Sequence, residues 1–102
     1  WALADNEVEL RASRWLYLAA AQSLDAGSDG ADAEVAGARL MAGSTATAVV
    51  DRTIQLHGSA GVSADLPLER WYRDLRLRRI DEGGEAAQRS TIANHLLTTF
   101  KK

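Results

Sequence analysis

Residues 2–26 read ALADNEVELRASRWLYLAAAQSLDA, a run without Gly or Pro that ends at Gly27. Ala is the commonest residue of the chain, at 19 of 102 positions, and an Ala-rich chain with few breakers favours helices. An apolar residue recurs every seven positions of the run, at Leu3, Leu10, Tyr17 and Leu24. We therefore predict a long helix that stops at Gly27. One face of it is expected to carry Leu3, Leu10, Ala20 and Leu24.

A second periodic stretch follows a polar turn, in which Asp29 or Asp32 is expected to cap the next helix. Residues 32–57 then carry a stripe at helical spacing: Val35, Ala38, Ala42, Ala46, Val49, Val50, Thr53 and Leu56. Gly37 and Gly43 lie inside this predicted helix, and each costs about 1 kcal/mol relative to Ala. We expect a packing reason for both, such as the close approach of a neighbouring helix.

A third helix is predicted after a loop of small residues at 58–65. Asp65 followed by Pro67 is a helix-start signal, so we place this helix at 66–76. Its apolar side is expected to enter the core with Leu68, Trp71, Tyr72 and Leu75.

A short non-helical link is predicted over 77–83, and a last helix over about 85–100. Four helices without a convincing strand indicate an all-α fold, an antiparallel four-helix bundle. The length of 102 residues suits one domain.

The composition excludes several classes of protein. With 46% apolar and 25% charged residues and a net charge of −2, the chain has the profile of a soluble globular domain. It has no Cys for disulfides or thiolate chemistry, and no apolar stretch long enough to span a membrane. Acidic residues near the start do not fit a signal peptide, and we predict a cytoplasmic location.

Charge is spread unevenly along the chain. Residues 1–34 carry a net charge of −5, and residues 70–79 carry +4. The basic segment has two interpretations: a solvated helix face that pairs with the acidic half of the chain, or a contact for phosphate groups or an acidic subunit. Binding of nucleic acid is not predicted, because the domain is not basic overall.

Two motifs in the second half occur in a specific order. The first reads QLHGSAGV at 55–62 and runs into DLPLERWYRD at 65–74; the second reads RIDEGG at 79–84, followed by QR at 88–89. They resemble the patterns Q-x-H-G-G-x-G, D-x-P-x-x-R-x-x-R-D and I-Y-E-G-T of the acyl-CoA dehydrogenase family, in its C-terminal helical domain. The resemblance covers nearly the whole of residues 1–102, more loosely in the first helices.

The resemblance implies FAD-dependent α,β-dehydrogenation of an acyl-CoA thioester, as in fatty acid β-oxidation. Glu82 matches the catalytic base that removes the α-proton, and Asp81 and Gly83 beside it are expected to contact the substrate. From the residues alone, Glu82 could instead cap the last helix. The N-terminal helical and middle β domains of such an enzyme are absent from this chain, which we predict to be inactive by itself.

The resemblance also assigns FAD contacts to Gln55, Gly58, Gly61 and Gly84. Glycines allow backbone N–H groups to approach phosphate oxygens, although the 58–61 segment could also be a simple helix terminator and turn. The implied partners are sister subunits in a homodimer or homotetramer, and an electron-transfer flavoprotein or a similar acceptor. His57 is expected to make a structural hydrogen bond, and His95 has no partner at ligand spacing, so no metal site is predicted.

The chain departs from the family pattern at three positions. Asp81 stands where the family has Tyr, Gly84 where it has Thr, and Ser59 where it has Gly. Two other hypotheses stay open: an acyl-CoA oxidase, which passes electrons to oxygen, and a helical assembly module without catalysis.

Overall fold

The computed structural model describes residues 1–81 and 84–101, and all regular structure in these ranges is helical. Its α-helices are α1 (Ala2–Asp25), α2 (Ala31–His57), α3 (Leu68–Arg78) and α4 (Gly84–Phe100), with a short 3₁₀ helix, η1 (Gly58–Val62), after α2. The predicted all-α fold of four antiparallel helices is confirmed.

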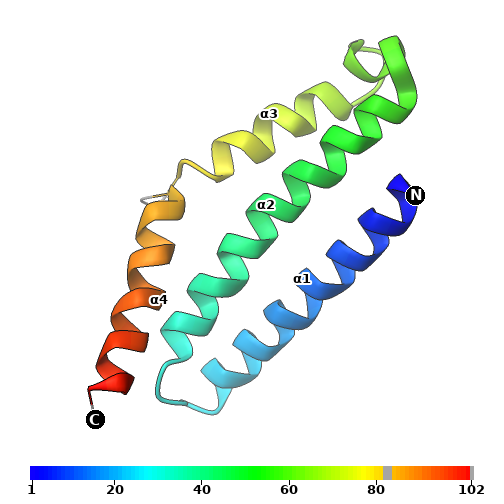
Figure 1. The fold of residues 1–102 in the computed structure, drawn as a ribbon. Coiled ribbons are helices and arrows are strands. Elements are labelled where there is room, and N and C mark those ends of the chain that lie inside the picture. The colour runs from blue at the N-terminus through cyan, green and yellow to red at the C-terminus, as the bar shows by residue number, and fades with distance from the viewer. Residues whose placement is uncertain (82–83, 102) are drawn as a thin grey trace.

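Helix α2 is the centre of the fold, and the other helices all pack on it (Figure 1). Helix α1 runs antiparallel along one flank of α2, while α3 and then α4 run antiparallel along the other flank. The molecule is therefore elongated, with dimensions of 54 × 26 × 22 Å. Because α4 follows α3 along α2, the C-terminus lies at the same end of the molecule as the α1–α2 turn.

Helix α1 ends at Gly27, the residue after its C-cap Ala26, as the sequence predicts. Gly27 has a φ of 62°, and its N–H donates to the carbonyl oxygen of Leu24 at 3.0 Å. The N–H of Ser28 donates to the carbonyl oxygen of Ser23, also at 3.0 Å. This pair of hydrogen bonds is the Schellman motif, which satisfies carbonyl groups at the end of a helix.

Gly30, and not an aspartate, is the N-cap of α2. It has a φ of 85°, and a Cβ atom there would come within 2.7 Å of Nε2 of His95 in α4. The left-handed backbone at Gly30 therefore favours glycine, and a side chain there would also have to displace the His95 ring. The predicted capping by Asp29 or Asp32 is wrong, because no side chain makes a cap hydrogen bond and both are exposed.

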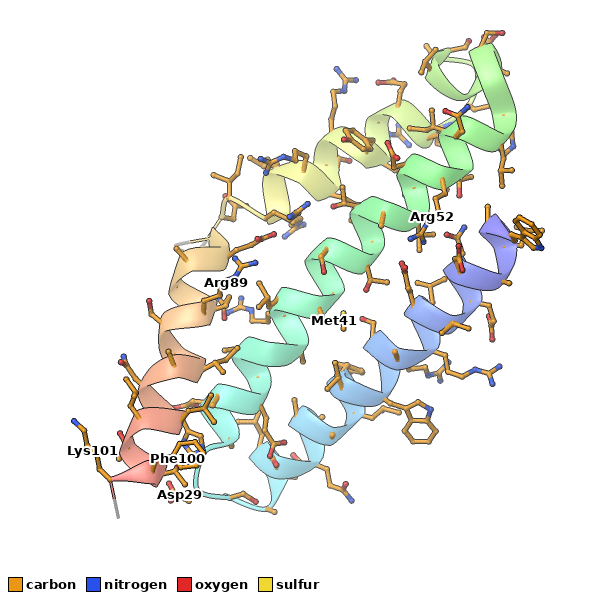
Figure 2. The ribbon with its side chains drawn as sticks, viewed as in Figure 1. Asp29, Met41, Arg52, Arg89, Phe100 and Lys101 are labelled. Carbon is orange, nitrogen blue, oxygen red and sulfur yellow. The ribbon has the colours of Figure 1, made fainter. Side chains whose placement is uncertain are left out.

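Arg52 of α2 fixes α1 in register. Its Nη1 donates to Oδ1 of Asn6 at 3.1 Å and to Oε2 of Glu9 at 2.8 Å, and its Nη2 donates to Oε1 of Glu9 at 2.7 Å. Figure 2 shows Arg52 between the two helices. The bidentate pairing defines the orientation of both side chains, because two parallel hydrogen bonds tolerate little rotation.

Helix α1 faces α2 through small and polar side chains. Its buried or half-buried positions recur at spacings of three, four or seven residues and include Ala2, Asn6, Glu9, Ser13, Ala20 and Ser23. On α2, Arg52 shares a heptad face with the buried residues Ala31, Ala38 and Thr45. Side chains of this size allow the two backbones to approach closely, although each buries little apolar area.

The apolar face predicted for α1 is correct only at Ala20, which is buried. Leu3, Leu10 and Leu24 are 73%, 46% and 53% exposed. The Arg52 contact explains the difference, because it commits the polar stripe of α1 to α2. Because successive residues of a helix are rotated by about 100°, Leu3, Leu10 and Leu24 then lie outside the stripe that faces α2.

One of the two glycines inside α2 has the packing reason that the sequence predicts. A Cβ atom at Gly43 would lie 3.3 Å from Cγ of Arg79, which follows α3. The expectation is wrong for Gly37, where a Cβ atom would meet nothing within 4 Å.

Helix α3 begins and ends two residues later than predicted, at 68 and 78. Pro67 is its N-cap, and no side chain makes a cap hydrogen bond. Asp65 is held in the preceding turn instead: Ser63 Oγ donates to its carboxylate at 3.0 Å, and its own N–H donates to Ser63 Oγ at 3.2 Å. The helix start predicted after Asp65 and the non-helical assignment of residues 77–78 are therefore wrong.

Helix α3 buries a narrower stripe of apolar side chains than predicted. Leu68 is buried and Tyr72 and Leu75 are half-buried, but Trp71 is 47% exposed. A helix that rests on one neighbour can bury a single stripe, and Trp71 lies beside that stripe.

We predict that Glu9→Gln lowers the melting temperature at pH 7. The melting temperature of the variant should also fall less than that of the unmodified protein when the pH is lowered. Hydrogen bonding to Arg52 holds the pKa of Glu9 below its usual value. The ion pair therefore stabilises the fold above the pKa of an unfolded glutamate, about 4.3, and this contribution is lost as pH falls through the lowered pKa. Thermal unfolding followed by circular dichroism at pH 7 and about pH 3 measures both effects.

Glu7→Gln is the matched control for this experiment. Glu7 pairs with Arg11 on the exposed side of the same helix, at 2.6 Å, so its removal should change stability little. Equal melting temperatures for the two variants at pH 7 would contradict a stabilising role for the Arg52 contact.

Candidate functional site

The residues of the two motifs form two separate groups in the structure. Gln55 lies in the last turn of α2, and Gly58 and Gly61 lie in η1. Asp81 and Gly84 lie together at the junction between α3 and α4, where both line one cleft. The chain therefore offers two candidate sites, one at the C-terminal end of α2 and one beside its middle.

The end of α2 presents an exposed stretch of backbone. Gly58 has a φ of 60°, its N–H donates to the carbonyl oxygen of Gln55, and a Cβ atom there would meet nothing within 4 Å. Both residues are exposed. His57 makes the structural hydrogen bond that the sequence predicts, from Nδ1 to the carbonyl oxygen of Thr53 at 2.7 Å. Gln55 and Gly58 thus fit a ligand that approaches the backbone closely.

Gly61 has a different role from Gly58. It is buried, and a Cβ atom there would lie 2.5 Å from the carbonyl oxygen of Ile54 and 2.9 Å from its Cα. The absence of a side chain lets η1 turn back onto α2. The predicted plain loop is therefore wrong over residues 58–62, which form a 3₁₀ helix packed on α2 through Gly61.

The cleft beside the middle of α2 has a volume of about 380 Å³. This is within the usual size of small-molecule pockets. Its walls come from α2, α3 and the start of α4, and include Arg39, Gly43, Ala46, Leu75, Arg78, Asp81, Gly84 and Gln88. The sequence-predicted base Glu82 and its neighbour Gly83 lie outside the described residues. The described residues on either side of them, Asp81 and Gly84, both face this cleft.

Charged side chains hold the two ends of the α3–α4 junction together. Nε of Arg79 donates to Oε1 of Glu85, and Nη1 of Arg89 donates to Oε2 of the same carboxylate at 2.9 Å. Hydrogen bonding to Arg79 and then to Arg89 lowers the pKa of Glu85. Glu85 is therefore a carboxylate that binds two guanidinium groups, and its position fixes the start of α4 against the end of α3.

This network could be predicted from the sequence only in part. Glu85 and Arg89 are four residues apart, the spacing at which side chains pair on a helix. Arg79 gives no comparable local signal, because it reaches Glu85 across the junction. The pair of Glu9 and Arg52 has none either, since 43 positions separate them.

One interpretation of the basic segment predicted that it pairs with the acidic half of the chain, and this interpretation is wrong. Of its arginines, Arg73 pairs with Glu69 on the same helix at 2.8 Å, and Arg79 pairs with Glu85. Residues 1–34 and 70–79 lie on opposite flanks of α2, and no ion pair joins them. The second interpretation, a contact with an anionic group or an acidic subunit, remains.

The part of the chain that the structure describes contains no group of three or more His, Asp or Glu side chains placed to bind a metal ion. None of its helices combines the length and the apolar character that a membrane span needs.

Comparison with known proteins identifies the family. Residues 1–97 match the family model "Acyl-CoA dehydrogenase, C-terminal domain". The chain is 38% identical over 99 residues to the mitochondrial short-chain specific acyl-CoA dehydrogenase of Sus scrofa, covering 97% of this chain and 24% of that protein. It is also 38% identical to the 3-sulfinopropanoyl-CoA desulfinase of Paraburkholderia xenovorans, covering 95% of this chain and 24% of the relative.

Solved structures agree with the sequence matches. A structure from Mycobacterium abscessus, assigned as an acyl-CoA dehydrogenase, superposes with a TM-score of 0.91 at 31% identity and covers 97% of this chain and 25% of that one. The electron transferring flavoprotein of Acidaminococcus fermentans matches with a TM-score of 0.87 at 28% identity, covering 94% and 25%. The chain thus spans about a quarter of the length of these relatives.

The fold and the matches define an all-helical C-terminal domain. The chain belongs to the acyl-CoA dehydrogenase family, and it corresponds to that family's C-terminal domain over residues 1–97.

We predict opposite effects for two glycine-to-alanine substitutions. Gly61→Ala should destabilise the protein, because its Cβ atom would meet the backbone of Ile54. Gly37→Ala should stabilise it by up to about 1 kcal/mol, because this helical position has open space and Ala is the better helix former. Urea unfolding of both variants measures the difference, and an equally stable Gly61→Ala protein would contradict the packing described for η1.

We also predict that Glu85→Gln loosens the α3–α4 junction locally. The variant removes the negative charge that binds Arg79 and Arg89, so amide hydrogen exchange should accelerate near residues 79–89. Glu69→Gln is the control, since it removes an ion pair within α3 alone. Unchanged exchange at the junction in Glu85→Gln would show that the network does not hold it.

Proposed function

We propose that the full-length protein is an FAD-dependent acyl-CoA dehydrogenase that oxidises the α,β-bond of an acyl-CoA thioester. The observation that carries the proposal is the cleft at the α3–α4 junction. Asp81 and Gly84, which flank the motif residue Glu82, both line it. The family match over residues 1–97 supports this assignment.

In this proposal, Glu82 takes the α-proton of the thioester as a general base. A carboxylate suits this role because it can accept a proton at a fixed position beside the substrate. Asp81 and Gly83 contact the acyl group near that base. The pairing of Arg79 and Glu85 supports the site indirectly, since it joins the helices on both sides of residues 82–83.

FAD, when bound, accepts the hydride that leaves the β-carbon. Gln55 and Gly58 would hold it, because both are exposed and the backbone at Gly58 is open to close approach. Gly61 contributes by packing η1 on α2, and Gly84, with a φ of 64°, starts α4 beside the cleft. The two groups lie apart along α2, so we propose that they serve different parts of the cofactor and substrate sites.

The proposed partners are sister subunits in a homodimer or homotetramer and an electron-transfer flavoprotein that reoxidises the cofactor. The structural match to an electron transferring flavoprotein of Acidaminococcus fermentans supports an electron-transfer context. A role in fatty acid β-oxidation fits a relative that acts as a short-chain acyl-CoA dehydrogenase. The cytoplasmic location stays a prediction.

Glu82→Gln in the full-length protein tests the proposal. The variant should keep its yellow flavin and lose dehydrogenation by at least about 10²-fold, because the amide cannot accept the α-proton. Turnover is measured with a panel of acyl-CoA thioesters and an artificial electron acceptor. Glu69→Gln, on the side of α3 and outside the cleft lining, is the matched control and should retain turnover.

Three outcomes would contradict the proposal or favour another function. Unchanged turnover in Glu82→Gln would remove this residue from the role of base. Turnover that uses oxygen directly would identify an acyl-CoA oxidase. A full-length protein without turnover on any thioester would favour the assembly module, a domain that keeps the family's fold without its reaction.

A further inference from the structure

Arg79 is the residue through which α2 contacts the α3–α4 junction beside the cleft. Its Nε donates to Oε1 of Glu85 in α4. A Cβ atom at Gly43 of α2 would lie 3.3 Å from Cγ of Arg79, and one at Gly84 would lie 3.2 Å from its carbonyl oxygen. All four residues line the cleft of the proposed function. Arg79 therefore connects α2 with the start of α4.

The side chain of Arg79 is held at both ends. Its backbone follows the last turn of α3, and its guanidinium group binds Glu85, which also binds Arg89. The side chains of Arg79 and Glu85 are 28% and 24% exposed, whereas Arg73, in its pair with Glu69, is 72% exposed. Solvent and salt therefore screen the Arg79 pair less than the pair within α3. Because Cγ of Arg79 lies between two fixed ends, a group that displaces it must also move the backbone or the ion pair.

Gly43 provides the space beside this side chain. Carbon atoms in contact are normally about 3.5–4.0 Å apart, so a Cβ atom at Gly43 would lie closer to Cγ of Arg79 than an ordinary contact allows. Glycine is a poor helix former, and Gly37 of the same helix has open space around it instead. Of the two glycines, only Gly43 exchanges helix propensity for room beside Arg79.

Backbone hydrogen bonds couple Arg79 to the lining of the cleft. The N–H of Asp81 donates to the carbonyl oxygen of Leu77 at 3.1 Å, and the N–H of Gly84 donates to that of Asp81 at 2.9 Å. Arg79 lies within this hydrogen-bonded segment, and Gly84 lies against its carbonyl oxygen. A displacement of Arg79 would therefore shift Asp81 and Gly84, which face the substrate and the cofactor in the proposed function.

We propose that Gly43 and Arg79 are positioning residues for the dehydrogenation. Gly43 lets the stem of Arg79 lie on α2, and Arg79, paired with Glu85, sets where Asp81 and Gly84 lie in the cleft. Neither Gly43 nor Arg79 takes part in proton or hydride transfer. The rate depends on them because reacting groups must be held in a near-attack geometry, and a displacement of about 1 Å can lower a rate by about 10²-fold. The inference rests on the proposed function for the identity of the reaction.

Gly43→Ala in the full-length protein tests this proposal. The variant should lower kcat by at least about fivefold, with a smaller change in KM, because the displacement alters the geometry of the reacting groups more than binding. Gly37→Ala is the matched control, since it makes the same change at another half-buried position of α2, and it should keep the full kcat. Flavin content and circular dichroism of each sample establish that the variants are folded and carry the cofactor.

A double-mutant cycle with Arg79→Ala provides the decisive measurement. Arg79→Ala alone should lower kcat, and adding Gly43→Ala to it should cause no further loss, because the new Cβ atom then has no Cγ to meet. Arg79→Lys should retain more of the rate than Arg79→Ala, since it keeps the stem and the charge. Glu85→Gln releases the guanidinium group, so Gly43→Ala should also cost less in that background. This second cycle serves if Arg79→Ala does not fold.

Three results would overturn the proposal. The first is a full kcat in Gly43→Ala, and the second is an equal loss of kcat from Gly43→Ala with and without Arg79. The third is a lower melting temperature in Gly43→Ala without a loss of kcat, which would show that the contact contributes to stability alone.

Measurements on Glu82→Gln separate this inference from the proposed function. If Glu82→Gln removes turnover while Gly43→Ala keeps it, the inference alone is wrong. If the unmodified protein turns over no thioester, the proposed function is wrong. Amide exchange at Asp81 and Gly84 then reads the same cycle, and acceleration by Gly43→Ala only when Arg79 is present would support the contact between the two residues.

Discussion

The rest of the structure depends on the close contact of α2 with helices on both of its flanks. Small buried residues, such as Ala38 and Thr45, leave room for a neighbouring backbone, but they contribute little apolar area. Specific polar contacts therefore set the orientation. Arg52 decides which stripe of α1 faces α2, and that choice leaves the leucines of α1 on the outside. Helices α3 and α4 lie one after the other along α2, and each packs on it.

Much of this fold could be predicted from the sequence, because helix formation is a local property. The Ala-rich runs, the stop at Gly27 and the order of four helices all follow from neighbouring residues. The rotation of α1 could not be predicted, because hydrophobic periodicity favours an inward Leu3 and Leu10, and the Arg52 contact that opposes it spans 43 positions. The start of α3 was misplaced because Ser63 and Asp65 form a turn of their own.

The candidate site, like the fold, could be predicted from the sequence only in part. The family resemblance assigned Asp81 to the substrate and Gly84 to FAD, and both residues line one cleft. The family resemblance assigned Gly61 the same role as Gly58, whereas only the fold shows that a Cβ atom at Gly61 would meet Ile54. A glycine in a motif can thus be required by packing within the chain as well as by a ligand.

The junction between α3 and α4 connects stability with the proposed chemistry. A general base works only at a defined distance from the proton that it removes. In the proposed function, the helices on either side of residues 82–83 would fix that distance. Glu85 binds one arginine from each side of residues 82–83, Arg79 before them and Arg89 within α4. The charge that maintains the site is therefore separate from the charge that would carry out the reaction, and each can be removed without removing the other.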